Sequence, residues 1–238
     1  MRKSHCTAVV LAAGQGTRMG IDVPKQYLEI NEKPVIYYTL QTFQKSEVID
    51  DIVLVVGRNE TAYAQDEIVE KYRFTKVGVI VEGGAERSDS VWEALQVLSD
   101  EAAENKHFVF IHDGVRMLVD ETILERAYEA VEKHRACVVG VPVKDTIKVS
   151  DGDQFVARTL DRGQLWQIQT PQVFEAPLIK EAYRRLMEAP KINVTDDSSV
   201  VESMLRIPVK LVEGTYENIK ITTRDDLYLA DIILNQNN

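Results

Sequence analysis

The chain has 238 residues, of which 45% are hydrophobic and 28% are charged, and its formal net charge at pH 7 is -10. This composition is ordinary for a soluble globular protein that can bury a full core. The negative charge argues against non-specific binding to nucleic acid, which needs a basic face, but not against a small anionic substrate. No run approaches 18 apolar residues, so neither a transmembrane helix nor a membrane partner is expected.

The beginning of the chain and its two cysteines indicate the compartment. The apolar run from Thr7 to Ala13 is short and ends in a glycine-containing loop, so we expect a strand there rather than a signal peptide. Cys6 and Cys137 are the only cysteines, which makes a disulfide framework unlikely to be the basis of the fold. We therefore expect a reducing, cytoplasmic location.

The first strand is followed by a loop that contains Gly14 and Gly16, and Arg18 and Lys25 come soon after. Glycines let a ligand approach the backbone, and free N–H groups beside two cations suit a polyphosphate. A P-loop would need Lys and Ser/Thr after its second glycine, and a dinucleotide fingerprint would need a third glycine. The loop therefore predicts a nucleoside triphosphate site of another kind, with two solvated loop cations as the alternative.

Strand-like and helix-like patterns then alternate along the chain. Four short apolar runs have the length of central strands, over 52–56, 77–81, 108–111 and 136–141. Apolar residues recur at i, i+3, i+4 and i+7 in three intervening helices, which start their stripes at Ile36, Val91 and Leu124. This alternation predicts a Rossmann-like α/β fold, a mainly parallel sheet with helices on both faces. Ligands of such sheets bind at the carboxyl ends of the strands.

The rhythm changes at a predicted β-hairpin arm over about 143–167. Two alternating segments, 143–149 and 155–160, flank the turn signal Ser150-Asp151-Gly152-Asp153 and show no helical period. The hairpin is expected to project from the body of the protein. Its spacing alone leaves open whether it is an added antiparallel edge or an arm that reaches a neighbouring subunit.

The remainder predicts more elements of the same domain. A helical stripe begins at Ile179, and Thr195 reads as the N-cap of another helix. Strands are expected over 209–212 and 219–222, and a final helix from about Leu227. Neither repeats nor linkers interrupt the pattern, so residues 1–238 are expected to form a single domain.

Two further segments at strand ends have residues suited to a ligand. Gly83-Gly84 gives a tight turn before a helix whose free N–H groups can meet a base or a phosphate, although a simple strand–helix connection is the alternative. After the strand 108–111, Asp113 can hold a metal or a sugar hydroxyl and Arg116 a phosphate; a buried ion pair is the alternative. The histidines and cysteines lack the spacing of a zinc site, and no Ser–His–Asp arrangement supports a nucleophilic side chain.

Taken together and in order, these segments resemble the 2-C-methyl-D-erythritol 4-phosphate cytidylyltransferases of the non-mevalonate isoprenoid pathway, over nearly the whole chain. The segments that carry the resemblance are Leu11-Ala12-Ala13-Gly14-Gln15-Gly16-Thr17-Arg18-Met19, Pro24-Lys25-Gln26, Gly83-Gly84, Ser90-Val91, His112-Asp113, Asp145-Thr146-Ile147-Lys148, Asp161-Arg162, Leu165-Trp166, Gln169-Thr170-Pro171-Gln172, Thr195-Asp196-Asp197 and Asn218-Ile219-Lys220-Ile221-Thr222.

The resemblance implies that CTP and methylerythritol phosphate, a polyol phosphate, are joined with release of pyrophosphate, and that Mg²⁺ or another divalent cation is held mainly by the CTP phosphates. The acceptor phosphate attacks the α-phosphorus in line, so positioning and charge neutralisation do the work. The residues implied as catalytic are Arg18, Lys25, Arg162 and Lys220. Those implied to bind the nucleotide are Ala12, Ala13, Gly14, Gly84, Ser90 and Asp113. Those implied to hold the acceptor are Asp113, Arg116, Thr146, Arg162, Thr170 and Lys220.

The resemblance also implies a homodimer in which the hairpin arm brings Thr146 and Arg162 to the partner's site. Two positions depart from the family pattern: Ala85 replaces a usual Asp, and Val115-Arg116-Met117 replaces Ala-Arg-Pro. Because valine before the arginine also occurs in pentitol-phosphate enzymes, a ribitol-5-phosphate cytidylyltransferase is the first alternative. A sugar-1-phosphate nucleotidyltransferase is a second. A catalytically silent nucleotide-binding module is the non-enzyme alternative, although its expected loss of basic site residues is not seen.

Overall fold

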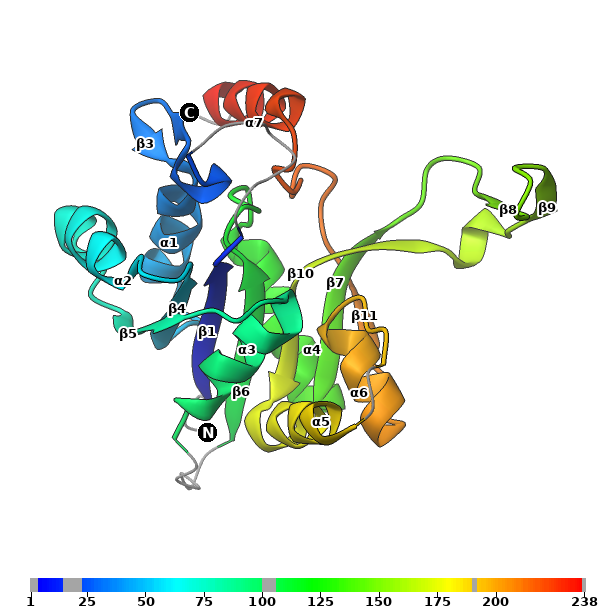
Figure 1. The fold of residues 1–238 in the computed structure, drawn as a ribbon, viewed down its shortest axis with the longest axis horizontal. Coiled ribbons are helices and arrows are strands. Elements are labelled where there is room, and N and C mark those ends of the chain that lie inside the picture. The colour runs from blue at the N-terminus through cyan, green and yellow to red at the C-terminus, as the bar shows by residue number, and fades with distance from the viewer. Residues whose placement is uncertain (1–3, 15–22, 100–105, 190–191, 237–238) are drawn as a thin grey trace.

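The computed structural model describes residues 4–14, 23–99, 106–189 and 192–236, and a seven-stranded sheet runs through it (Figure 1). In spatial order its strands are β11 (Lys210–Glu213), β7 (Ala136–Pro142), β10 (Trp166–Glu175), β6 (His107–Asp113), β1 (His5–Ala12), β4 (Asp51–Val56) and β5 (Val77–Glu82). Of these strands, β10 runs antiparallel to its neighbours β6 and β7, and the other pairings are parallel. The predicted mainly parallel α/β sheet is confirmed.

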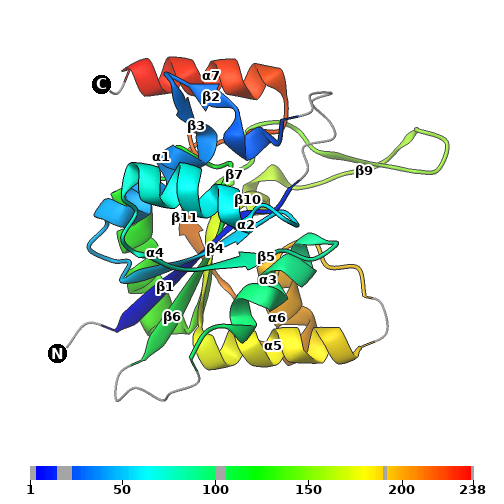
Figure 2. The same cartoon turned by 60° about the vertical axis from the view of Figure 1, so that its left-hand side comes forward.

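Helices cover both faces of the sheet because alternate residues of its central strands point in opposite directions. Val10 packs in a core shared with α1 (Val35–Lys45) and α4 (Glu121–His134). Val9 packs on the other side with α3 (Arg87–Gln96), α5 (Ala176–Glu188) and α6 (Asp197–Leu205). Figure 2 shows α3, α5 and α6 together on one side of the sheet. Both faces of β1 are therefore buried, which is why its sequence is apolar without interruption from Ala8 to Ala12.

The hairpin predicted within 143–167 is present. It consists of β8 (Lys148–Ser150) and β9 (Val156–Thr159), which pair antiparallel and stand away from the sheet in Figure 1. Phe155 and Val156 at its tip are 72% and 62% exposed. Whether this arm reaches a second subunit stays a prediction.

The C-terminal helix α7 (Arg224–Gln236) lies over a small separate core with the two-stranded ribbon β2 (Glu29–Ile30) and β3 (Lys33–Pro34). The strand predicted over 219–222 is wrong, because this segment is a loop whose Ile221 N–H donates to the Val115 carbonyl (3.0 Å). Burial of Ile221 under α7, rather than strand pairing, explains its apolar pattern. The helix begins at Arg224, earlier than predicted.

Two other expectations differ from the structure, and two of its elements were not predicted. The run 77–81 was expected as a central strand, but β5 is an edge strand with Val79 40% exposed. The N-cap of α6 is Asp196 rather than Thr195, because the Asp196 carboxylate accepts the Ser199 N–H (2.9 Å). Neither β10 nor the helix α2 (Thr61–Tyr63), which continues as a π-helix over Ala64–Glu70, was predicted.

Among the described residues, no helix is long and apolar enough to cross a membrane.

Candidate active site at the carboxyl edge of the sheet

A cavity of about 600 Å³ lies where β1, β4, β5 and β6 end. Segments that directly follow these strands supply most of its wall, and the lining residues are Leu11, Ala12, Ala13, Gly14, Lys25, Gln26, Gly57, Arg58, Glu60, Gly83, Gly84, Ala85, Glu86, Arg87, Ser90, Asp113, Val115 and Lys220. This is the edge at which open parallel sheets bind ligands. Among the described residues, four cationic side chains line it, although the chain as a whole is acidic: Lys25, Arg58, Arg87 and Lys220.

The double-glycine turn after β5 is packed too closely for side chains. A Cβ on Gly83 would lie 2.5 Å from the Ala13 Cβ and 2.6 Å from the Ser90 Oγ, and one on Gly84 would overlap the Asp89 Cβ. The Gly84 N–H donates to Ser90 Oγ (3.2 Å), and this hydroxyl donates to the Glu86 carbonyl (3.1 Å). Ser90 therefore holds the turn in shape, and its implied contact with cytosine stays a prediction.

Lys25 and Gln26 border the end of β1 from a short 3-10 helix, η2 (Lys25–Tyr27). The Lys25 Cε lies 3.6 Å from the position that a Cβ on Gly14 would occupy, so the lysine side chain passes beside Gly14, at the start of the predicted phosphate loop. Gln26 is 1% exposed, and its Nε2 donates to the Ala12 carbonyl (2.6 Å). Its Oε1 is buried without a hydrogen-bond partner. The Gln26 side chain thus fixes the backbone at Ala12, the last residue of β1, where the loop begins.

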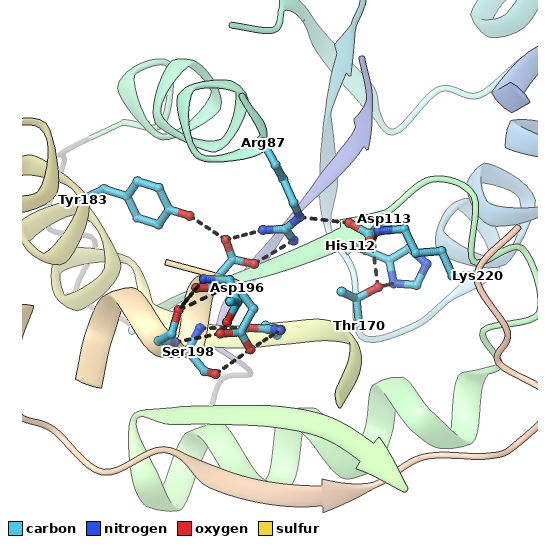
Figure 3. Close-up of polar contacts among 12 residues, drawn as sticks. Arg87, His112, Asp113, Thr170, Tyr183, Asp196, Ser198 and Lys220 are labelled. Atoms are coloured by element: carbon cyan, nitrogen blue, oxygen red, sulfur yellow. Dashed lines mark hydrogen bonds and ion pairs between the residues drawn. The ribbon is translucent and has the colours of Figure 1, made fainter. Parts of the chain in front are cut away.

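Asp113, the last residue of β6, is clamped between two cations (Figure 3). Its Oδ1 accepts from the Arg87 Nε (3.1 Å), and its Oδ2 lies 2.7 Å from the Lys220 Nζ. Burial raises the pKa of this carboxyl, but the charges of Arg87 and Lys220 outweigh burial and hold the pKa well below its ordinary value. Asp113 is therefore a fixed anion at neutral pH.

A buried hydrogen-bonded chain supports Asp113 from below. The Asp113 N–H donates to the Thr170 Oγ1 (3.1 Å), and that hydroxyl is 3.0 Å from the His112 Nδ1. The His112 Nε2 lies 3.1 Å from the Arg116 carbonyl, which can only accept, so Nε2 carries the proton and Nδ1 accepts from Thr170. Burial lowers the pKa of His112 to about 4, which matches a neutral ring.

Arg116 and Thr170 lie beside the cavity rather than in its wall. Thr170 is buried beneath Asp113, and the Arg116 Nη1 donates to the Asn218 carbonyl (2.7 Å). The Asn218 Nδ2 in turn donates to the Thr170 carbonyl (2.9 Å). These contacts tie the loop that carries Lys220 to β10, so four of the implied acceptor-binding residues form one connected group: Asp113, Arg116, Thr170 and Lys220. Their contact with an acceptor stays a prediction.

The remaining predicted site residues lie elsewhere. Thr146 and Arg162 are exposed on the arm, where the Arg162 Nη1 donates to the Lys144 carbonyl (2.8 Å), and neither lines the cavity of its own chain. Arg18 lies outside the described residues. The cavity of one chain therefore unites Ala12, Ala13, Gly14, Lys25, Gly84, Ser90, Asp113 and Lys220.

Sequence reasoning gave no role to five polar residues of the cavity wall, which are Gln26, Arg58, Glu60, Glu86 and Arg87. Arg58 follows β4 and Arg87 begins α3, while Gln26 was noted in its motif but given no role. Two of them, Arg58 and Arg87, could have been predicted from the sequence. Polar residues that directly follow parallel strands lie at the same edge of the sheet, the carboxyl edge. Arg58 follows the apolar run 52–56 by this rule, and Arg87 follows the glycine turn.

Comparison with known proteins decides the family. The family model of 2-C-methyl-D-erythritol 4-phosphate cytidylyltransferase matches residues 6–236. The chain belongs to this family. A family member from Lachnospira eligens is 49% identical over 229 residues, which are 96% of this chain and 98% of the relative. Another from Caldanaerobacter subterraneus is 46% identical over 230 residues, covering 97% and 99% of the two chains.

Solved structures of the family share the fold. The crystal structure of 4-diphosphocytidyl-2C-methyl-D-erythritol synthase from Anaerococcus prevotii has a TM-score of 0.82 and 33% identity, covering 98% of this chain and 99% of that one. A Francisella tularensis 2-C-methyl-D-erythritol 4-phosphate cytidylyltransferase has a TM-score of 0.76 and 32% identity, covering 96% and 99%. The resemblance found in the sequence motifs is confirmed over nearly the full length.

Proposed function

We propose that this protein condenses CTP with 2-C-methyl-D-erythritol 4-phosphate, giving CDP-methylerythritol and pyrophosphate. The names of its relatives support this activity. The observation that carries the proposal is the cavity at the carboxyl edge, where an acidic chain gathers Lys25, Arg58 and Lys220. Two anionic substrates repel each other, so a site that joins them must supply positive charge at the point of contact.

The chemistry needs no nucleophilic side chain, because the acceptor phosphate is already ionised at neutral pH and attacks the α-phosphorus of CTP. Arg18 and Lys25 neutralise the triphosphate as charge develops on the leaving pyrophosphate. Lys220, with Arg162, orients the acceptor phosphate for in-line attack. Holding both reactants in this geometry lowers the barrier by converting a bimolecular step into an effectively unimolecular one.

The nucleoside is placed by the strand ends. The backbone at Ala12, Ala13 and Gly14 lines the nucleotide, and the packed Gly84–Ser90 turn meets the cytosine. Asp113 faces the ribose and the metal region, since its carboxylate is fixed at the end of β6. Arg116, Thr146 and Thr170 complete the acceptor site. The close contacts around Gly83 and Gly84 support this arrangement, because a side chain at either position would force the turn to move.

Mg²⁺ or another divalent cation belongs to this proposal as a nucleotide-borne ion. Among the described residues, no group of three or more His, Cys, Asp or Glu side chains could hold a metal. Mg²⁺ commonly binds through substrate phosphates and one or two carboxylates, and Asp113 is the carboxylate best placed to join them. Bound there, the ion would offset charge on the triphosphate while Lys25 and Lys220 act from either side.

We further propose a homodimer, built from one nucleotidyltransferase domain per chain over residues 1–238. The arm supports this proposal because it carries Thr146 and Arg162 away from the chain's own cavity and exposes Phe155 and Val156 at its tip. Arms exchanged between two copies would bring these residues to the partner's site. A cytoplasmic location is supported by Cys6 and Cys137, which are both buried and are not joined to each other by a disulfide.

The test is a pyrophosphate-release assay with CTP, Mg²⁺ and each of two acceptors. Release with methylerythritol phosphate and little with ribitol 5-phosphate is expected. Release with ribitol 5-phosphate alone would favour the pentitol enzyme, which the names of the relatives do not favour. Tight CTP binding without release from either acceptor would instead favour a silent nucleotide-binding module, and release with a sugar 1-phosphate the more distant enzyme class.

A further inference from the structure

Behind the cavity, a buried carboxylate grips one of the cavity's cations. Asp197, which is 0% exposed, accepts from both terminal nitrogens of Arg87, at 2.8 Å from Nη1 and 2.8 Å from Nη2. Asp197 does not line the cavity, whereas Arg87 does. The guanidinium therefore lies between Asp197, which contacts its terminal nitrogens, and Asp113, which contacts Nε; Figure 3 shows the contact of Arg87 with Asp113. The three side chains thus form a continuous line from the interior of the protein to the site.

Each charge of the Arg87–Asp197 pair would be energetically unfavourable at its position without the other. Arg87 is the first residue of α3, where the helix dipole disfavours a positive charge. Asp197 has lost all contact with solvent, which is expensive for a carboxylate unless its charge is compensated. A local arrangement that departs from such rules is expected chiefly at functional sites. The pair therefore calls for a role beyond joining α3 to α6.

Compensation for Asp197 comes from three sources. Arg87 supplies two charge-assisted hydrogen bonds, and the Tyr183 hydroxyl donates to Oδ1 (2.6 Å). Asp197 is also the first residue of α6, where the helix dipole favours a negative charge. Its neighbour Asp196 has a different task, since it caps the helix and accepts from Gln172 (3.0 Å). The anion is therefore held in one position.

Because the guanidinium is planar and rigid, its two hydrogen bonds to Asp197 also orient its third nitrogen, Nε. An arginine head is planar and presents its N–H groups in a rigid fork, so fixing Nη1 and Nη2 also fixes where Nε points. In this protein the Arg87 Nε points at the Asp113 Oδ1 (3.1 Å). Lys220 holds the other carboxylate oxygen of Asp113. Without Asp197, Arg87 could rotate its head toward the cavity and release Asp113.

We propose that Asp197 is a positioning residue for Asp113 and acts through Arg87. The inference rests on the proposed function, in which Asp113 faces the ribose of CTP. Asp197 also neutralises Arg87, so the cation orients the nucleoside end of the site instead of attracting the triphosphate. This role gives a reason for Asp197 in the Thr195-Asp196-Asp197 motif, since Asp197 does not line the cavity.

The experiment compares Asp197→Asn and Arg87→Lys with Tyr183→Phe as the matched control. An asparagine cannot accept from both guanidinium nitrogens, and a lysine keeps the charge but cannot span two carboxylates. Tyr183→Phe removes a hydrogen bond from the same buried carboxylate and leaves the two Arg87 bonds in place. Thermal unfolding shows which variants remain folded. The readouts are the KM for CTP, the affinity for CTP by calorimetry, and the arginine Nε–H signals in ¹H–¹⁵N NMR spectra.

Asp197→Asn and Arg87→Lys are each expected to weaken CTP binding by about 10- to 100-fold, by analogy with the loss of a residue that orients a metal ligand. The double variant should be no weaker than Arg87→Lys alone, because Asp197 acts through Arg87. Tyr183→Phe should lower thermal stability while CTP affinity stays near that of the unmodified protein. A protected Arg87 Nε–H signal should be present in the unmodified protein and in Tyr183→Phe, and lost in Asp197→Asn.

Several outcomes would overturn the inference. CTP affinity that falls only in proportion to stability, and equally in Tyr183→Phe, would make Asp197 a purely structural residue. So would additive effects in the double variant, or an unchanged Arg87 Nε–H signal in Asp197→Asn. Failure of the proposed function is seen separately, as unmodified protein that binds CTP but releases no pyrophosphate with any acceptor. In that case the NMR signal and CTP affinity still decide the role of Asp197.

Discussion

Lowering the pH from 7.5 to 5 is expected to destabilise this protein through one buried histidine, His112. Its ring is neutral, with Nδ1 accepting from Thr170 and Nε2 donating to the Arg116 carbonyl. A second proton on Nδ1 would face the Thr170 hydroxyl, which already accepts from the Asp113 N–H. Protonation would replace the bond that Thr170 donates and would place a charge in a fully buried site, and this burial lowers the pKa of His112 to about 4.

The sign and size of the effect follow from this pKa. An unfolded histidine titrates near 6.5, so between about pH 6.5 and pH 4 the unfolded chain binds a proton that the folded protein excludes. Stability contributed by the neutral ring is thus complete above about pH 6.5 and is lost as the pH falls. The shift of the pKa from 6.5 to about 4 corresponds to about 3 kcal/mol in the free energy of unfolding, and about 2 kcal/mol of this is lost by pH 5.

The measurement is urea unfolding at fixed protein concentration from pH 5 to 7.5, for the unmodified protein and for His112→Asn. Asparagine offers a donor and an acceptor but does not titrate in this range. The variant should be less stable at every pH, since a smaller side chain leaves a void beside Phe43, whose ring centre is 5.1 Å from that of His112. Its loss of stability on acidification should be smaller by about 2 kcal/mol.

Comparison of the two proteins isolates this histidine. His107, whose pKa is also lowered by burial, is present in both and cancels from the difference. Asp113 stays ionised over the whole range, because its pKa lies well below its ordinary value. The same pH dependence in both proteins would refute the assignment of His112 as a buried neutral ring.

Three further predictions concern the cavity and the arm. Lys25→Ala should lower kcat by about 100- to 1000-fold, the scale of losing one preorganised donor, and an unchanged kcat in steady-state assays would remove its assigned role. Arg162→Ala should impair use of the acceptor while CTP affinity by calorimetry stays near normal. If arms are exchanged, mixing inactive Lys25→Ala and Arg162→Ala chains should restore activity; failure despite confirmed subunit exchange would place each site within one chain. Gly83→Ala should weaken CTP binding and lower stability by about 1–3 kcal/mol in urea unfolding, because its Cβ would meet the Ala13 Cβ at 2.5 Å, and unchanged values would show that the turn can adjust.

Local patterns in the sequence predicted much of the fold. The stripe that begins at Ile36 became α1, since its spacing places one apolar face against the sheet. Uninterrupted apolar runs became β1, β4 and β6 because both faces of these strands are buried. Strand β10 escaped prediction because the polar run Gln169-Thr170-Pro171-Gln172 breaks its alternation, although these side chains are buried in the structure. Its polar groups are satisfied by partners that are distant in the sequence.

Pairings across long separations were the part that sequence reasoning could not reach. Arg87 and Asp197 are 110 residues apart, and neither has a local feature that indicates the other. The apolar residues of 219–222 were expected to pair as a strand, but they pack under α7, an arrangement set by tertiary contacts. By contrast, Asp113 and the Gly83-Gly84 turn were found from the sequence alone. Their positions directly after parallel strands determine that they share one edge of the sheet.

A crystal structure with CTP and Mg²⁺ bound tests the central claim most directly. The account predicts the triphosphate beside Lys25 and Gly14, the cytosine against the turn at Gly84, and the ribose facing Asp113. The α-phosphorus should remain open on the side of Lys220, where the acceptor phosphate would attack. Nucleotide density on another face of the molecule, with the carboxyl edge of the sheet left empty, would contradict the account.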